Sequence, residues 1–129
     1  RSYVATVIDV EVQGTDIKVH DAYVVLDCGT HINPDTCVAQ MEGAVVFGLS
    51  LALKSEITFD KGSAVQGNLD TYELIRMMES PRVTVDLVQS EALPAGVGEP
   101  GVPPVAPALT NAIFAASGQR IRKLPVSLA

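Results

Sequence analysis

The chain has 129 residues, of which 47% are hydrophobic, and this is enough apolar material for one compact domain with a continuous core. Nine basic and fifteen acidic residues give a net charge of −6 at pH 7, which argues against nucleic acid as a partner because its binding depends on neutralising phosphates. No apolar run approaches the ~18–20 residues that span a bilayer, so we predict no membrane span.

The first predicted elements are two strands joined by a tight turn. Residues 2–12 alternate between apolar and polar side chains, which is the period of a half-buried strand. Residues 14–16 supply the turn, and residues 17–26 form the second strand. The apolar phase of this strand shifts near Asp21, which predicts either a bulge or burial on both faces.

The next predicted element is a helix that runs to about Leu53. Asn33 can cap its N-terminus, Pro34 suits the first helical position, and Asp35 is favourable at the positive end of the helix dipole.

This helix contains four unusual residues. Gln40 and Glu42 interrupt an otherwise apolar run, and if they are buried each needs a hydrogen-bonding partner. Gly43 and Gly48 each cost about 1 kcal/mol relative to Ala in a helix. We therefore predict that another backbone or a bulky ligand lies close to them, although ordinary core packing explains them equally well.

The remaining elements complete an α+β fold. Residues 55–66 predict a hairpin, residues 67–81 are irregular, and residues 82–88 alternate as a further strand. A last helix opens at Pro103 and ends at Gly118. We predict one domain over residues 1–129, in which two principal helices pack on a mainly antiparallel sheet.

The cysteines and histidines carry little functional signal. Cys28 and Cys37 are nine positions apart without a C-x-x-C pattern, so we interpret them as ordinary thiols rather than a disulfide framework or a metal site. His20 and His31 have no catalytic-triad pattern around them. The sequence predicts no metal ligand among these residues.

A glycine-rich loop before the last helix is the strongest candidate for chemistry. Gly96, Gly98 and Gly101 leave a backbone that can take unusual angles and approach a ligand closely, and Pro100 restricts the single ionisable residue, Glu99. Residue chemistry alone slightly favours the alternative, a well-capped structural connection into the helix.

Two separated motifs carry a family resemblance. One comprises residues 96–108, 111–113 and 118–125 near the C-terminus, and the other comprises residues 27–29, 33–36 and 40–44 upstream. Together they resemble the molybdenum hydroxylases, the family of xanthine dehydrogenase, aldehyde oxidoreductase and the isoquinoline 1-oxidoreductases. The sequence is most similar to the large (beta) subunit of the last group, and the resemblance covers essentially the whole chain.

The resemblance implies roles for individual residues. Glu99 matches the family glutamate that acts as the active-site base beside molybdenum, when an oxygen atom derived from water is transferred to an electron-poor carbon. Gln40 resembles the glutamine that contacts the pterin cofactor, and the backbone of Gly96, Val97 and Gly98 would pass close to the metal and the pterin.

The resemblance also implies what surrounds this chain. We expect the C-terminal portion of a larger molybdopterin-binding subunit, a molybdenum–molybdopterin cofactor in its cytosine dinucleotide form, and a separate iron–sulfur small subunit. The substrate would be an N-heterocycle or an aldehyde, and the isolated chain would be inactive and free of cofactor. We expect a cytoplasmic location, with the periplasm as the alternative. A non-catalytic α+β module that serves assembly is the competing function.

Overall fold

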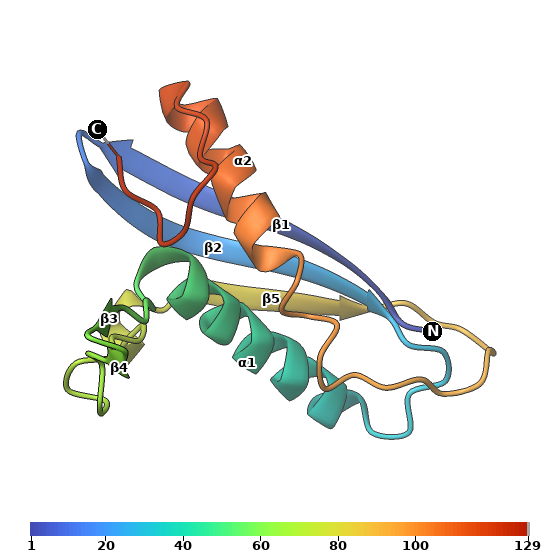
Figure 1. Ribbon diagram of the computed structural model, residues 1–129. Helices are drawn as coiled ribbons and strands as arrows, with labels where there is room; N and C mark the ends of the chain where they lie inside the picture. The colour runs from blue at the N-terminus through green and yellow to red at the C-terminus, as the bar shows by residue number, and fades with distance from the viewer. Residues whose placement is uncertain (129) are drawn as a thin grey trace.

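The computed structural model describes residues 1–128 and contains a three-stranded sheet with both long helices on one of its faces (Figure 1). The strand order is β1-β2-β5. β1 (Tyr3–Gln13) pairs antiparallel with β2 (Asp16–Asp27), and β5 (Arg82–Leu87) pairs parallel with the other edge of β2. The predicted α+β class is confirmed, and antiparallel pairing predominates because β1 and β2 pair along their whole lengths.

The predicted irregularity in the second strand is a β-bulge. Asp9 lies opposite Asp21, but the next residue of β1, Val10, lies opposite Val19, so that His20 is the extra residue on β2. The bulge restores the alternation on each side of it, and the helix-facing side chains of both strands enter the core.

α1 (Pro34–Leu53) begins where the sequence predicts. The Asn33 side chain accepts a hydrogen bond of 3.1 Å from the backbone N–H of Thr36, and Pro34 occupies the first turn. This bond satisfies one of the N–H groups that a helix start leaves without an intrahelical partner.

The cap gives a first testable prediction. Asn33→Ala is expected to lower the free energy of unfolding by about 1 kcal/mol, because it leaves the Thr36 N–H without its acceptor. Urea unfolding would measure the loss. Asn111→Ala, on an exposed position of the second helix, is the matched control and is expected to change stability by less than about 0.5 kcal/mol. Equal effects of both substitutions would contradict the capping role.

α1 meets the length and composition criterion for a membrane span, although the sequence contains no uninterrupted apolar run of that length. It has 20 residues, and its most apolar window has a mean hydropathy of 1.5. Its buried side chains, which include Met41, Val45 and Leu49, pack into the core beside α2 and β5. This is the environment that the core helix of a globular domain occupies.

α2 (Val105–Ser117) packs on β1 and crosses α1. It ends at Gly118, which has a φ of 73° as the predicted C-terminal glycine. A β-carbon on Gly48 would stand 2.7 Å from Cβ of the buried Val105 in α2, so ordinary core packing, the alternative given for Gly48, accounts for this glycine. At Gly43, by contrast, no described atom lies within 4 Å of that position.

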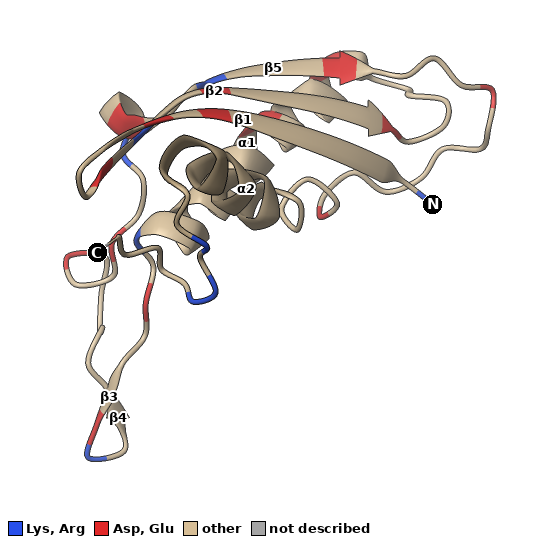
Figure 2. Ribbon diagram, turned by 90° about the horizontal axis from the view of Figure 1, so that it is seen from above, with Lys and Arg blue, Asp and Glu red and all other residues tan. Residues whose placement is uncertain are grey.

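The predicted hairpin is shorter than expected. β3 (Phe59–Asp60) and β4 (Ser63–Ala64) have two residues each, and they form the tip of an arm that extends away from the body of the protein (Figure 2). All four residues are exposed, and a two-stranded ribbon without a buried face has little to stabilise a longer ladder. Between this arm and β5, the described chain is irregular except for a 3-10 turn, η1 (Met77–Glu79).

Candidate functional site

The glycine loop packs directly on the N-terminal half of α1. A β-carbon on Gly101 would stand 2.6 Å from Cβ of Ala44 and 3.0 Å from Sδ of Met41. Real β-carbons essentially never approach other atoms so closely, so a side chain at position 101 would push the loop off the helix. The absence of a side chain at Gly101 is therefore explained by packing within the chain.

The two motifs that the sequence singled out meet at this contact. A β-carbon on Gly98 would lie 3.6 Å from Nε2 of Gln40, which is an ordinary van der Waals distance. The loop and the helix thus bring together two residues that are far apart in the sequence. Gln40 and Glu42 are both exposed, so the premise that they are buried is wrong: the pattern of apolar residues did not reveal which face of α1 the core covers.

The other two glycines of the loop are not explained by the chain itself. Gly96 and Gly98 have no left-handed φ angle, which corrects the expectation of unusual backbone angles there. No described atom lies within 4 Å of a β-carbon built on Gly96, and at Gly98 only Gln40 does. The described residues would therefore tolerate side chains at both positions, and the space beside them is open.

The Glu99 side chain makes no polar contact with the rest of the described chain. The residue is exposed, and within residues 1–128 its carboxylate has no hydrogen-bond or ion-pair partner. Its backbone carbonyl accepts a bond of 3.2 Å from the N–H of Val102. The residue before α2, Pro104, makes no side-chain cap. In the described chain the Glu99 side chain therefore does not cap α2, and its carboxylate is free to meet a ligand. The packing of Gly101 on α1 agrees with the other part of the alternative, a structural connection into the helix. Val97, beside it, is half-buried against the core.

The chain that leads into the loop is held by residues that the sequence did not single out. Thr30 donates both its N–H (2.9 Å) and its hydroxyl (3.0 Å) to the carbonyl of Ala92. The N–H of Ala95 donates to the carbonyl of Cys28 at 2.9 Å, and the Ser2 hydroxyl donates to the carbonyl of Gly96 at 2.6 Å. These bonds fix the start of the loop against the ends of β1 and β2.

Gly29 makes this bracing possible. It has a φ of 73°, and its β-carbon would stand 2.3 Å from the carbonyl oxygen of Leu93 and 2.8 Å from that of Ala92. Only glycine fits both the angle and the space. A glycine two residues after the end of β2 is the sequence signal for this turn.

The two cysteines belong to the hydrophobic core and not to the candidate site. Cys28 and Cys37 are both free and buried, and they belong to the same hydrophobic cluster. Burial raises the pKa of the Cys28 thiol, and the neighbouring Cys37 adds to this effect. A thiol with a raised pKa is a poor nucleophile and a poor metal ligand, which agrees with the prediction of ordinary thiols.

One further polar atom, in the residue after Thr30, lacks a hydrogen-bond partner in the described chain. Nδ1 of His31 is buried and makes no hydrogen bond with any described residue. His31 follows directly on Thr30 in the turn that supports the loop. Among residues 1–128, no group of three or more His, Cys, Asp or Glu side chains could hold a metal ion.

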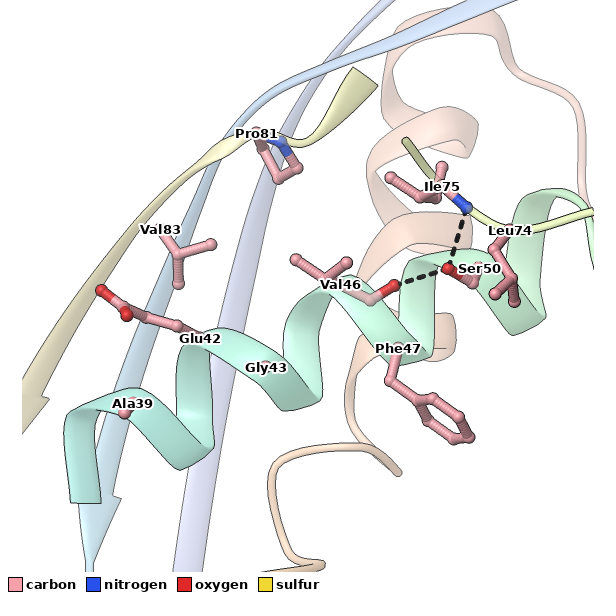
Figure 3. Close-up of a pocket in the computed structure, with 10 residues that line it drawn as sticks. All are labelled: Ala39, Glu42, Gly43, Val46, Phe47, Ser50, Leu74, Ile75, Pro81 and Val83. Carbon is pink, nitrogen blue, oxygen red and sulfur yellow. Dashed lines mark hydrogen bonds between the residues drawn. The ribbon is translucent and has the colours of Figure 1, made fainter. Parts of the chain in front are cut away.

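A second hollow lies on another side of α1 (Figure 3). This pocket of about 640 Å³ lies between α1 and β5, and Gln40 and the glycine loop take no part in it. Its floor includes Gly43 and Val46, and Phe47 extends away from the sheet at its edge. Its one buried polar side chain, Ser50, is satisfied, because its hydroxyl donates to the carbonyl of Val46 and accepts from the N–H of Ile75. Apart from Ser50 and the exposed Glu42, the lining is apolar, so the pocket offers little catalytic chemistry.

Comparison with known families gives one match. Residues 2–81 match the model of the molybdopterin cofactor-binding domain. The match includes Gln40 and Thr30, and it ends before the loop that contains Glu99.

Two curated relatives extend over more of the chain. The beta subunit of isoquinoline 1-oxidoreductase from Brevundimonas diminuta is 34% identical over 128 residues, which are 98% of this chain and 16% of that protein. A membrane-bound aldehyde dehydrogenase [pyrroloquinoline-quinone] from Gluconacetobacter polyoxogenes is 41% identical over 103 residues, which are 80% of this chain and 13% of that protein. The chain thus spans less than a fifth of the length of either relative.

Solved structures share the fold. A Cu,Mo-CO dehydrogenase superposes with a TM-score of 0.76 at 27% identity, over 91% of this chain and 16% of that chain. Quinoline 2-oxidoreductase from Pseudomonas putida 86 superposes with a TM-score of 0.71 at 24% identity, over 85% of this chain and 15% of that chain, a likeness of fold alone.

Proposed function

Because this chain belongs to the family of molybdopterin cofactor-binding domains found in molybdenum hydroxylases, we propose that it forms one wall of a molybdenum active site, with Glu99 as the base. The cofactor would lie against the glycine loop, where Gln40 and the backbone of Gly96, Val97 and Gly98 would contact it. The assembled enzyme, of which this chain supplies a part, would be the active species, and the isolated chain would be inactive.

The single observation that carries this proposal is the open space at Gly96 and Gly98. Neither residue needs to be glycine for its backbone angle or for its neighbours in the chain. Glycine at both positions is accounted for if a bulky group outside the chain approaches the backbone. The free amide of Gln40, beside Gly98, adds donors and an acceptor, which suits a pterin ring rich in hydrogen-bonding atoms.

The chemistry divides between the cofactor and the chain. When bound, the molybdenum cofactor supplies the redox centre that takes two electrons from the substrate. Glu99 would accept the proton that is released when water-derived oxygen is activated, since a free carboxylate is a competent general base. Pro100 and the packing of Gly101 on α1 hold this carboxylate in place.

The names of relatives support narrower proposals. We propose an N-heterocycle of the isoquinoline type, or an aldehyde, as the substrate, because two relatives are named for these activities. The partners would be the rest of a larger molybdopterin-binding subunit and a separate iron–sulfur subunit, since the two buried cysteines here cannot hold a cluster. The cytosine dinucleotide form of the cofactor and a cytoplasmic location complete the proposal.

The contact with the cofactor can be tested with Gly98→Val in the assembled holoenzyme. A side chain at this position meets only Gln40 within the chain, so folding is expected to be unchanged. Against a bound cofactor, an overpacking cost of about 1–3 kcal/mol would weaken binding about 5- to 150-fold. Molybdenum content per protein, measured by mass spectrometry of the metal at limiting cofactor, would report the loss.

Gly67→Val is the matched control, because Gly67 also lies in an irregular segment with nothing within 4 Å of its β-carbon position. It is expected to retain full molybdenum content. Full content in Gly98→Val as well would contradict the placement of the cofactor and would favour the alternative, a non-catalytic assembly module.

A further inference from the structure

The face of the sheet opposite the helices is uncovered in the described chain (Figure 2). It carries an apolar patch, which consists of Tyr3 and Val7 on β1 and Tyr23 and Val25 on β2. These side chains are 67%, 65%, 45% and 41% exposed, in that order. The strand register places Val7 directly opposite Tyr23, with Val25 two residues further along the same face, so the four side chains form one continuous surface.

Carboxylates lie at two borders of this patch. Asp9 follows Val7 on the same face of β1 and lies opposite Asp21 on β2, and Asp86 on β5 lies beside Val25. One cation serves these three acids, because Nε of Arg82 donates to Asp21 at 2.7 Å. We refer to Asp9, Asp21 and Asp86 as the acidic rim.

The acidic rim is unbalanced in the chain as described. Like charges directly opposite each other in a sheet are destabilising, and the ion pair with Arg82 relieves this repulsion for Asp21 alone. Within residues 1–128, Asp9 and Asp86 have no ion-pair partner. Further along the strands the charges are compensated, since Glu11 lies opposite Lys18 and contacts His20 at 3.1 Å. The negative excess is therefore confined to the border of the apolar patch.

This distribution excludes a second copy of the same face as the occupant. Two such faces would bring acidic rims together, and juxtaposed like charges across an interface cost several kcal/mol. A surface with an apolar centre and a border of Lys or Arg would instead bury the tyrosines and valines and neutralise Asp9 and Asp86. Tyrosine-rich apolar centres with polar rims are also the usual anatomy of protein interfaces.

We infer that the outer face of the β1-β2-β5 sheet is a docking surface for a polypeptide surface that residues 1–129 do not supply, with an apolar centre and a basic rim. The inference does not depend on the proposed cofactor site, because the glycine loop contributes no residue to this face.

A defined probe can test this inference on the folded chain. We choose a soluble synthetic peptide that alternates lysine with valine, and a peptide that alternates lysine with serine as its apolar-free control. Amide chemical shifts of the chain, recorded during titration, locate the binding. The expected result is a set of shifts centred on Val7, Tyr23 and Val25, with the lysine–serine peptide binding about tenfold or more weakly.

Charge variants separate this surface from general attraction to an acidic protein. The double variant Asp9→Asn, Asp86→Asn is expected to weaken binding about tenfold and to reduce its salt dependence. The matched control is Asp70→Asn, Glu91→Gln, which removes the same charge from exposed residues outside the sheet and is expected to change binding by less than about twofold. All four side chains are exposed, so their replacement should leave the fold intact. Equal weakening by both pairs, or shifts centred on the pocket at Phe47, would overturn the inference.

Discussion

Glu99→Gln is expected to lower the turnover of the assembled oxidoreductase by about 10²- to 10⁴-fold, the usual contribution of a general base. Glutamine has the shape of glutamate but cannot accept the proton. The carboxylate makes no hydrogen bond or ion pair within residues 1–128, so the substitution removes no contact that stabilises the chain. Molybdenum content and the unfolding transition should therefore match those of the unmodified protein.

The measurement is steady-state turnover with an N-heterocycle or an aldehyde, normalised to bound molybdenum. Glu91→Gln is the matched control, because Glu91 is an exposed carboxylate in the same connection between β5 and α2. It should keep turnover within about twofold of the unmodified enzyme, as surface substitutions away from a site usually do. Turnover of Glu99→Gln near the unmodified rate, at equal molybdenum content, would refute Glu99 as the base.

Gly29→Ala is expected to produce the largest loss of stability among single substitutions near the site, about 2–5 kcal/mol. The left-handed φ of 73° costs an L-residue about 1–2 kcal/mol. The methyl group would also stand 2.3 Å from a backbone oxygen of Leu93, and relieving such overpacking costs about 1–3 kcal/mol. The obstacle is backbone, so residues 92–95 would have to move, and with them the start of the glycine loop.

Gly14→Ala isolates the first of these two costs. Gly14 also has a left-handed φ, of 60°, but nothing lies within 4 Å of its β-carbon position. Urea unfolding should therefore show a loss of about 1–2 kcal/mol for Gly14→Ala and a clearly larger loss for Gly29→Ala. If the two losses are equal, the contact between the Gly29 turn and residues 92–95 contributes nothing to stability.

Local signals predicted the helices and strands well, because the interactions that start and stop them are local. The Asn33 cap, Pro34 in the first turn and Gly118 at the end of α2 all act within one helical turn. The hairpin at residues 55–66 was predicted too long, because alternation of side chains indicates a strand only where one face is buried. Here neither face is buried.

The periodicity of the sequence could not predict which strands pair or which helix face is buried. The pattern of residues 82–88 indicates a strand, but its parallel pairing with β2 depends on how α1 and the irregular segment cross between them. The exposure of Gln40 likewise depends on which face of α1 the sheet and α2 cover. The sequence of so apolar a helix does not reveal its buried face, because the hydrophobicity of its two sides differs little.

The candidate site was predicted in part. Family resemblance named Gln40 and Glu99, and the structure places Gln40 beside Gly98, the residue that precedes Glu99. The supports of the loop were missed, because they are hydrogen bonds to backbone carbonyls across 62 residues, from Thr30 to Ala92, and across 94, from Ser2 to Gly96. No spacing rule within a window of the sequence reports such bonds.

The bracing of the glycine loop has a mechanical consequence. The loop is attached at both ends. Hydrogen bonds from Ser2 and to Cys28 hold Gly96 and Ala95 at one end, and packing on α1 holds Gly101 at the other. Glu99 lies between these two attachments, and its side chain makes no polar contact with the described chain. The range of positions open to its carboxylate is therefore limited by the short stretch of backbone between the two attachments. Loosening either attachment would broaden that range.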